Sequence, residues 1–450
     1  MKSDVRNSMS DTLAGKYFLR GEEGYEEARR SSVWHAGVPD RFPEVIVQAH
    51  SEADVVAAVR AAVKADLKVG VCSGRRSWTA NHLRDGGMLL DLSRLREAHV
   101  DAAAMKASAQ PGLWAADFIK ELAAQDLFFP GGHCTGVALG GYLLQGGYGW
   151  SGRAYGPACA SVEAIDVVTA DGELLHADDA QNSDLLWAAR GSGAGYFGVV
   201  TRFYVRLYPL PKVIASASYR YPIDVLDEVL AWTLQVGPRL APFIDFELMI
   251  QRNDGGTPEI TIGAPAFAST KEEAARALSI LQTCPVLDRA ISAVPNVPTT
   301  MRELVDMMPM LQWAPYRWFG DNMWTHGPVE KLLPGIHRII EALPEPPGYL
   351  QLMPWGRDIP LIDMAFDLQD DAYIAIFSAG TDPAEDSARA AWTTDSVRWM
   401  EAAASGAQLA DENLGRRPVK FMSDEHMARL DQIRAARDPH GRFHSWMGRL

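Results

Sequence analysis

The residues with the clearest chemical potential lie in one glycine-rich stretch, Pro130 to Trp150. It contains glycine doublets at 140–141 and 146–147, one thiol at Cys134, and a tyrosine after each doublet, Tyr142 and Tyr148. Glycine is kept where the backbone needs a positive φ or where a ligand approaches the main chain closely. The stretch therefore predicts either backbone laid against a large flat ligand or an ordinary glycine-rich turn of an α/β protein.

A second candidate site is the turn Ser73 to Ser77, which follows a predicted strand at 67–72. A strand that ends in small residues leaves several backbone N–H groups pointing one way, and such groups bind anions. Arg75 and Arg76 add positive charge to this turn. The turn therefore predicts an anion site, with a solvated surface turn as the alternative interpretation.

Candidate groups in the second half of the chain are acidic, phenolic or aromatic. Asp245, Glu247 and Tyr373 occupy predicted strand positions and are candidate acid/base groups. The segment from Trp313 to Trp324 is unusually aromatic. Such residues either pack in a core or form the wall of a pocket for a ring-bearing substrate, and the sequence leaves both interpretations open.

The elements that must position these residues follow from the hydrophobic periodicity. Before a predicted boundary near Pro211, strands at 45–48, 67–72, 88–92 and 162–168 accompany helices at 55–67, 113–125 and 184–190. Beyond it, predicted strands at 214–221, 244–251, 259–263 and 374–378 alternate with helices at 226–236, 271–281, 329–342 and 384–403. This pattern predicts an α+β domain. We expect three parts, residues 1–212, 213–410 and 411–450.

Bulk composition argues against several classes of protein. The chain has 450 residues and a net charge of −14, which disfavours nucleic acid and anionic membrane as partners. Its four cysteines lack C-x-x-C spacing, so we expect no metal site and no disulfides, and reduced thiols are typical of a cytoplasm. The polar start, Met1 to Ser8, has no apolar segment typical of a secretion signal. No apolar run reaches membrane-spanning length, so the sequence predicts a cytoplasmic globular protein.

Taken in order, these segments resemble the flavoproteins of the vanillyl-alcohol-oxidase / p-cresol-methylhydroxylase (PCMH-type) superfamily, and they are most similar to the berberine-bridge-enzyme-like branch. The resemblance rests on the Ser73–Gly74 turn, Cys134 with its glycine doublets, and the segments 146–149, 184–191 and 198–203. It implies an α+β fold with a two-subdomain FAD-binding domain and a substrate domain built on an antiparallel sheet. It also implies a C-terminal segment that returns to the FAD domain.

The resemblance further implies that FAD lies extended between the domains, with its pyrophosphate at the Ser73–Ser77 turn. The residues implied in cofactor binding are Ser73, Gly74, Arg75, Arg76, Ser77, Cys134, Val137, Gly140, Gly141, Tyr142, Gly146, Gly198, Val199 and Val200.

Several positions depart from the family pattern. Many members carry a histidine in the first turn that bonds covalently to the flavin; Arg76 stands there, so no histidyl link can form. Cys134 matches the cysteine of the second covalent link, and we expect His133 to lower its thiol pKa. The alternative for Cys134 is a small buried thiol. Tyr142 stands where relatives often have histidine, and the family's C-terminal Tyr-Val-Asn-Tyr motif is not recognisable near residues 407–413.

The resemblance implies an FAD-dependent oxidoreductase that passes a substrate hydride to flavin N5, with O2 or another acceptor reoxidising the flavin. The candidate catalytic residues are Tyr148, Tyr373 and Glu247, and Tyr148 alternatively packs beside the flavin. We expect a small organic substrate, an alcohol, an amine or a polycyclic natural product, and a monomer or homodimer. Two alternatives stay open: an oxidative cyclisation, decarboxylation or rearrangement in secondary metabolism, and a non-catalytic FAD-binding protein.

Overall fold

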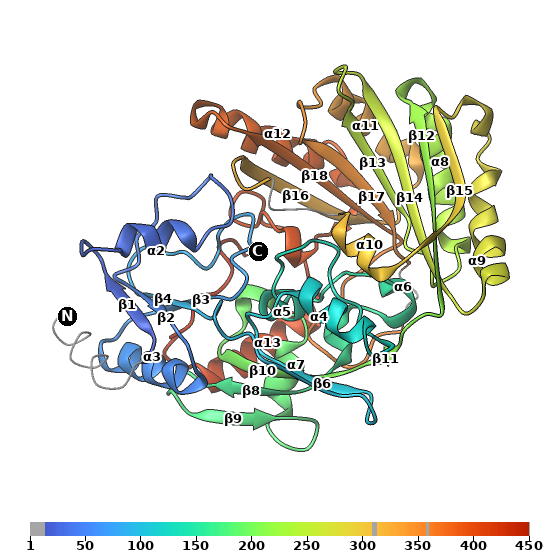
Figure 1. Cartoon of the computed structure of the whole chain (residues 1–450). Coiled ribbons are helices and arrows are strands. Elements are labelled where there is room, and N and C mark those ends of the chain that lie inside the picture. Colours follow the sequence, from blue (N-terminus) through green and yellow to red (C-terminus); the bar gives the residue numbers. More distant parts are fainter. Residues whose placement is uncertain (1–13, 308–312, 357–359, 450) are drawn as a thin grey trace.

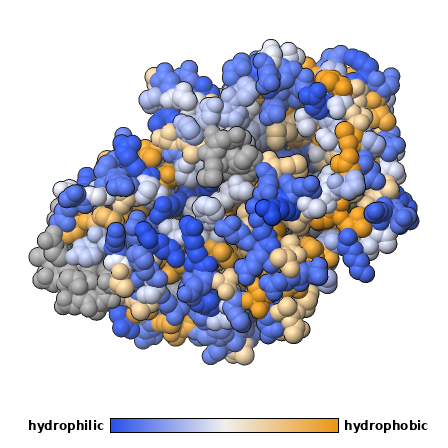
Figure 2. Space-filling view, in the orientation of Figure 1, coloured by the Kyte–Doolittle hydropathy of each residue, from blue (hydrophilic) through white to orange (hydrophobic). Residues whose placement is uncertain are grey.

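The computed structural model describes residues 14–307, 313–356 and 360–449. The polar start, Met1 to Ser8, in which we predicted no secretion signal, lies outside the described residues. Within the described residues, no helix combines the length and the apolar character that a bilayer crossing requires. On the face shown in Figure 2, hydrophobic residues form small scattered patches among hydrophilic ones.

The first sheet is small and mostly parallel. Its strands lie in the order β1 (Lys16–Leu19), β2 (Val45–Gln48), β4 (Met88–Asp91) and β3 (Val69–Cys72). β2 and β3 both run parallel to β4, and β1 is antiparallel to β2. Helix α3 (Glu52–Lys64) connects β2 to β3, and Ser51 and Asp54 cap its first turn reciprocally. Helix α2 (Tyr25–Ser31) lies between β1 and β2 in the chain.

The second sheet is antiparallel. Its strands lie in the order β5 (Ala98–Asp101), β6 (Lys106–Ala109), β10 (Val199–Arg206), β8 (Val162–Val168) and β9 (Leu174–Ala177). The helices associated with this half of the molecule are α4 (Ala115–Ala123), α5 (Leu139–Leu144), α6 (Gly152–Tyr155), α7 (Ser183–Ala189) and α13 (Asp424–Arg437). The short strands β7 (Leu127–Phe128) and β11 (Tyr208–Pro209) pair separately.

The third sheet is large and entirely antiparallel (Figure 1). Its order is β15 (Ser292–Thr299), β12 (Val213–Pro222), β14 (Pro258–Ala268), β13 (Glu247–Arg252), β17 (Tyr349–Pro354), β18 (Ala372–Gly380), β16 (Arg317–Thr325) and β19 (Ala404–Gly406). Helices α8 (Leu226–Val236), α9 (Lys271–Leu278), α11 (Val329–Glu341) and α12 (Asp386–Arg398) pack on its outer face, and α10 (Met301–Asp306) lies near α4. The α+β fold with a large antiparallel sheet is therefore confirmed.

Side-chain alternation along the central strands gives this sheet two different faces. Leu248 and Ile250 of β13 and Leu350 and Leu352 of β17 are fully buried in the core beneath the helices. Because successive side chains point to opposite faces, the odd-numbered residues of both strands point away from these helices. This second face faces the rest of the chain and carries the polar and aromatic residues described below.

The C-terminal segment returns to the first sheet. The Val69 N–H donates to the Arg442 carbonyl at 2.7 Å, and the His444 N–H donates to the Val69 carbonyl at 3.0 Å. Phe443 thereby lies parallel to β3 and is buried in the core of the first sheet.

Candidate active site

A cavity of about 330 Å³ lies between the turn after β3, the glycine-rich stretch and the inner face of the large sheet. Its walls come from segments far apart in the chain: 69–78, 132–148, 193–203, 408–411 and 443–445, together with β13, β17 and β18. It therefore joins both predicted sites in one space.

The turn at residues 73–77 lines the cavity with all five of its residues. Arg75 adopts a left-handed backbone with φ of 61°, and a Cβ at Gly74 would lie 2.7 Å from the Ala138 backbone nitrogen. Within the described residues, the backbone N–H groups of 74–77 donate to no protein acceptor. The Arg75 guanidinium donates to Asp91 at 2.5 Å and to Ser93 at 2.8 Å, so it braces the turn against β4. The turn can therefore offer backbone N–H groups to an anion.

The glycines of the central stretch serve two purposes. A Cβ at Gly141 would meet no protein atom within 4 Å although this residue lines the cavity, so any side chain there would enter the cavity. A Cβ at Gly140 would lie 2.6 Å from the Ser73 hydroxyl, and one at Gly149 would lie 2.4 Å from the Tyr142 hydroxyl. Gly141 thus keeps space open for a ligand, whereas Gly140 and Gly149 allow close packing of the protein on itself.

Two predicted cofactor residues, Gly146 and Val199, are not among the residues that line the cavity. Gly146 has φ of 106° and faces the Phe366 ring, whereas Val199 is fully buried in the core of the first sheet. The other predicted cofactor residues do line it: Ser73, Gly74, Arg75, Arg76, Ser77, Cys134, Val137, Gly140, Gly141, Tyr142, Gly198 and Val200.

The cation near the Cys134 thiol is Arg76 and not His133. Burial raises the pKa of Cys134 to about 12, the carboxylates of Asp411 and Glu247 add to this shift, and Arg76 opposes it. Burial lowers the pKa of His133 to about 4, so this imidazole is neutral at pH 7. The prediction that His133 lowers the thiol pKa is therefore wrong. Arg76 donates through Nε to the Gly136 carbonyl at 3.3 Å.

The inner face of the large sheet also lines the cavity, and the centroid of its Phe377 ring lies 4.8 Å from that of the Trp78 ring, which follows the turn at 73–77. Cross-strand pairing sets Tyr349 of β17 beside Phe377 of β18, and Met353 beside Tyr373. The cavity residues from the three strands are Glu247, Met249, Tyr349, Gln351, Met353, Tyr373 and Phe377. The sheet thereby brings Glu247 and Tyr373, both predicted, into the same space.

Asp411, which the sequence did not identify as a site residue, hydrogen-bonds to Tyr373. The Tyr373 hydroxyl donates to Asp411 Oδ2 at 2.5 Å, and Trp78 Nε1 donates to Asp411 Oδ1 at 2.6 Å. Burial raises the pKa of Asp411 above its ordinary value. Burial, followed by the nearby Asp411 charge, raises the pKa of Tyr373 well above its ordinary value. This arrangement can pass a proton from a phenol to a carboxylate.

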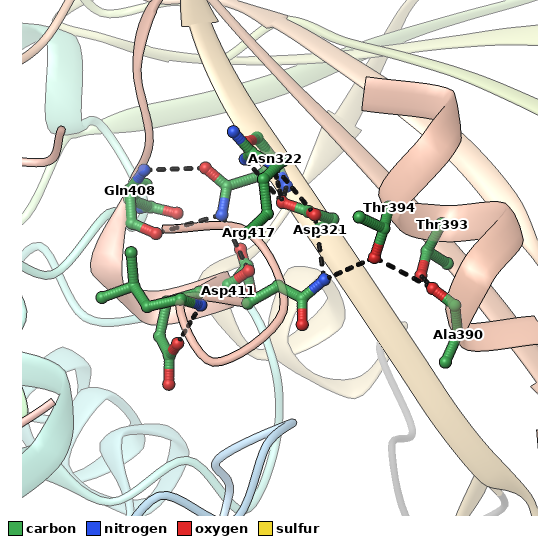
Figure 3. Close-up of polar contacts among 11 residues, drawn as sticks. Asp321, Asn322, Ala390, Thr393, Thr394, Gln408, Asp411 and Arg417 are labelled. Carbon is green, nitrogen blue, oxygen red and sulfur yellow. Dashed lines mark hydrogen bonds and ion pairs between the residues drawn. The ribbon is translucent and has the colours of Figure 1, made fainter. Parts of the chain in front are cut away.

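A buried polar network fixes the loop that carries Asp411 (Figure 3). Asn322 Nδ2 donates to the Gln408 carbonyl at 3.0 Å and to the Asp411 carbonyl at 2.7 Å, and its Oδ1 accepts from the Gln408 N–H at 2.7 Å. Beside it, Arg417 donates to Asp321 at 2.6 Å in an ion pair whose side chains are 4% and 0% exposed. These contacts hold the loop against β16.

Tyr148 and Glu247 line the cavity in different settings. The Tyr148 ring packs on Trp355, with ring centroids 4.6 Å apart, and its buried hydroxyl has no hydrogen-bond partner within the described residues. Glu247 Oε1 accepts from Gln351 Nε2 at 2.7 Å, and burial raises the Glu247 pKa to about 7. Asp245 lies outside the cavity lining and accepts from the Ser151 N–H at 2.6 Å.

The aromatic segment realises both interpretations that the sequence left open. Trp313 lines the cavity, whereas Trp318 and Trp324 are almost completely buried. Most aromatic wall residues come from elsewhere, among them Trp34, Trp78 and Trp355.

Comparison with known proteins identifies relatives over nearly the whole chain. Residues 43–178 match the family model described as an FAD binding domain. The FAD-linked oxidoreductase nodO of Hypoxylon pulicicidum is 31% identical, over 93% of this chain and 94% of that protein. The (R)-6-hydroxynicotine oxidase of Paenarthrobacter nicotinovorans is 29% identical over 56% of each chain.

Solved structures share the fold. The 6-hydroxy-D-nicotine oxidase from Arthrobacter nicotinovorans superposes with a TM-score of 0.84 at 21% identity, covering 97% of this chain and 98% of that chain. The BBE-like 1 protein of Physcomitrella patens superposes with a TM-score of 0.85 at 17% identity, covering 98% of each. Both confirm the PCMH-type architecture.

Proposed function

This chain belongs to the berberine-bridge-enzyme-like FAD-linked oxidoreductases of the PCMH-type superfamily, and we propose that it is an oxidase of small organic substrates. The observation that carries the proposal is the joint cavity, whose lining includes both the turn at 73–77 and the Tyr373–Asp411 pair. The named activity of the nicotine oxidase relative supports O2 as the electron acceptor.

The cavity fits FAD on two observations. The free backbone N–H groups of the turn at 73–77 suit a pyrophosphate, and the empty space in front of Gly141 suits a large flat group. We assign the turn, Gly141 and Val200 to FAD binding. FAD, when bound, supplies the hydride acceptor, and the protein supplies binding, orientation and proton removal.

Tyr373 and Asp411 act together as the base in this proposal. The substrate O–H or N–H proton moves to the Tyr373 phenolic oxygen while the proton of Tyr373 moves to Asp411 Oδ2 along their 2.5 Å hydrogen bond. The net result is a neutral carboxylic acid, which burial favours because it raises the pKa of Asp411. The relay avoids a free phenolate, which the raised pKa of Tyr373 disfavours.

The wall of the cavity favours a substrate with an apolar ring system, such as an alcohol, an amine or a polycyclic natural product. Trp355, Tyr349 and Phe377 present large apolar surfaces there. Tyr148 contributes a buried hydroxyl that has no hydrogen-bond partner in the described part of the chain, which suits contact with a bound group.

We also propose that Cys134 attaches FAD covalently. The thiol lines the cavity, and a thiolate is the reactive form. Because burial raises its pKa to about 12, ionisation depends on Arg76, the one cation that lowers this pKa among the residues that the structure describes. The proposal therefore ties the covalent link to Arg76 as well as to Cys134.

The test of the oxidase function uses the purified full chain. We expect a yellow protein whose flavin absorbance bleaches when an alcohol or amine of the aromatic class is added without oxygen. Readmitting air should restore the colour with one peroxide per substrate. A colourless protein that cannot be reconstituted with FAD would overturn the proposal, and bleaching without peroxide would replace O2 by another acceptor.

A further inference from the structure

We propose that Glu247 and the aromatic and thioether side chains around it form a subsite for a protonated amine, so that the substrate is an organic cation with an apolar ring system. The inference deepens the proposed function and rests on it for the identification of the cavity as the substrate pocket. It concerns recognition of the substrate and assigns a role in binding to Glu247.

The first observation is that one oxygen of Glu247 is held and the other is free. Gln351 Nε2 donates to Oε1 at 2.7 Å from the neighbouring strand, and the same nitrogen lies 3.4 Å from the Met353 sulfur. Within the described residues, Oε2 accepts no hydrogen bond and forms no ion pair, although Glu247 lines the cavity. An oriented carboxylate with a free oxygen is suited to accept from an ammonium N–H.

The second observation is the charge balance around this carboxylate. Among the described residues that line the cavity, Arg75 and Arg76 are the only arginines, and there is no lysine. Arg75 pairs with Asp91, and the Arg76 guanidinium lies 4.7 Å from the Trp34 ring centroid. Leaving a carboxylate in an apolar cavity without a cation is costly, so a cation arriving with the substrate would be strongly favoured.

The two cavity acids, Glu247 and Asp411, differ in the hydrogen bonds that their oxygens accept. Both Asp411 oxygens already accept a hydrogen bond, from Tyr373 and from Trp78, whereas within the described residues Glu247 has one oxygen that accepts none. The two carboxylates nevertheless face a common space, because both Glu247 and Asp411 line the same cavity. The geometry therefore assigns different roles to the two acids: Asp411 accepts the substrate proton, and Glu247 binds the positive charge of the substrate.

The third observation is the nature of the surrounding walls. Tyr349, Tyr373 and Phe377 offer aromatic rings, and Met249 and Met353 offer polarisable sulfur, all from the same sheet face as Glu247. Aromatic faces stabilise ammonium groups, and thioethers adapt to irregular apolar ligands. A carboxylate set among such residues favours a cation with apolar substituents over a small hydrated cation.

The test measures binding of two probes of the same shape to the FAD-loaded protein. Benzyltrimethylammonium carries a permanent charge, and neopentylbenzene is its neutral isostere. We expect the cation to bind at least about tenfold more tightly than the isostere, with phenylacetate weaker still. Flavin absorbance shifts or calorimetry report binding without turnover. Equal affinities, or tighter binding of phenylacetate, would overturn the proposal on the parent protein alone.

Substitutions then test whether Glu247 provides the negative charge that binds the cation. Glu247→Gln keeps the shape and the Gln351 hydrogen bond, and we expect it to weaken cation binding about tenfold while leaving the neutral isostere unchanged. Asp245→Asn is the matched control, because it removes an acid two positions away that lies outside the cavity lining, and it should retain cation binding. Unchanged cation binding in Glu247→Gln, or an equal loss in both variants, would refute the assignment to Glu247.

The outcomes also distinguish this inference from the oxidase function. A protein that oxidises neutral alcohols with peroxide release and shows no preference for the cation retains the proposed function and loses the subsite. A protein that holds FAD and prefers the cation, yet reduces with none of the amines tested, keeps the subsite and loses the oxidase function.

Discussion

The Asp411→Asn substitution removes the proposed proton acceptor while keeping its shape. In the parent protein the carboxylate accepts from Tyr373 at 2.5 Å and from Trp78 at 2.6 Å. An indole N–H can only donate, so the amide oxygen must face Trp78 and the amide NH₂ must face Tyr373. The phenol oxygen can accept from that NH₂, which keeps two hydrogen bonds but leaves no group to receive the phenolic proton.

This geometry gives separate magnitudes for stability and for rate. Because the number of hydrogen bonds is unchanged and a buried charge is lost, the free energy of unfolding should change by less than about 1 kcal/mol. A general base contributes roughly 10²- to 10⁴-fold to the rate of its step. That range corresponds to about 3–5 kcal/mol in the barrier for flavin reduction.

The assay is anaerobic stopped-flow reduction of the bound flavin, with Tyr373→Phe and the double variant alongside. We expect either single variant to slow reduction by about 10²-fold or more, and the double variant to be little slower than the singles, since the two residues act as a unit. Melting temperature and FAD content serve as controls. Reduction of Asp411→Asn within about threefold of the parent would refute the relay.

The same experiment has a predicted pH dependence. The base is active when Asp411 is ionised, and burial raises its pKa, so the parent rate should fall as the pH falls through that raised value. In Asp411→Asn this fall in rate at low pH should disappear. Glu247, whose pKa is about 7, remains in both proteins, so a fall in rate at low pH that persists in the variant would be due to Glu247.

Three further substitutions test the cavity and its supports. Gly141→Leu should give a folded but colourless protein, because the new side chain enters the cavity. Gly263→Ala is the control: a Cβ there also meets no atom within 4 Å, and this variant should stay yellow. The ratio of flavin absorbance to protein content measures both, and a yellow Gly141→Leu protein would contradict the assignment of Gly141 to FAD binding. Arg417→Leu leaves Asp321 buried and unpaired, so it should cost about 3–5 kcal/mol in urea unfolding, and a loss under about 1 kcal/mol would show that the pair is dispensable. Cys134→Ala should abolish flavin fluorescence on acid-treated denaturing gels, and fluorescence that persists there would exclude a link through Cys134.

Much of the fold could be predicted because local signals and tertiary packing agree. The helix predicted at 226–236 is α8 with the same bounds, and its apolar stripe packs on the large sheet. Strand β15 could not be predicted, since Pro295 and Pro298 argue against a strand; they are tolerated because β15 is the edge of the sheet. The predicted helix at 384–403 ends at Arg398, after which the chain turns into β19.

The candidate site could be predicted only in part, because some of its residues are brought together by tertiary contacts that leave no local signal in the sequence. Tyr148 was predicted from the family resemblance, and Tyr373 and Glu247 from residue type and predicted strand position; the structure does set all three on one cavity. Gln351 carries a strand signal in the alternation of its neighbours, but its pairing with a strand about a hundred residues away follows from tertiary structure alone. Asp411 lies in an irregular loop without periodicity, and its role depends on the distant Tyr373.

The return of the C-terminal segment to β3 has a consequence for biosynthesis. Residues 443–445 form part of the cavity wall, and Phe443 lies beside the strand that carries Val69. A nascent chain on the ribosome has therefore made the turn at 73–77 long before it makes this part of the cavity wall. The complete cavity can form only after translation has passed residue 445.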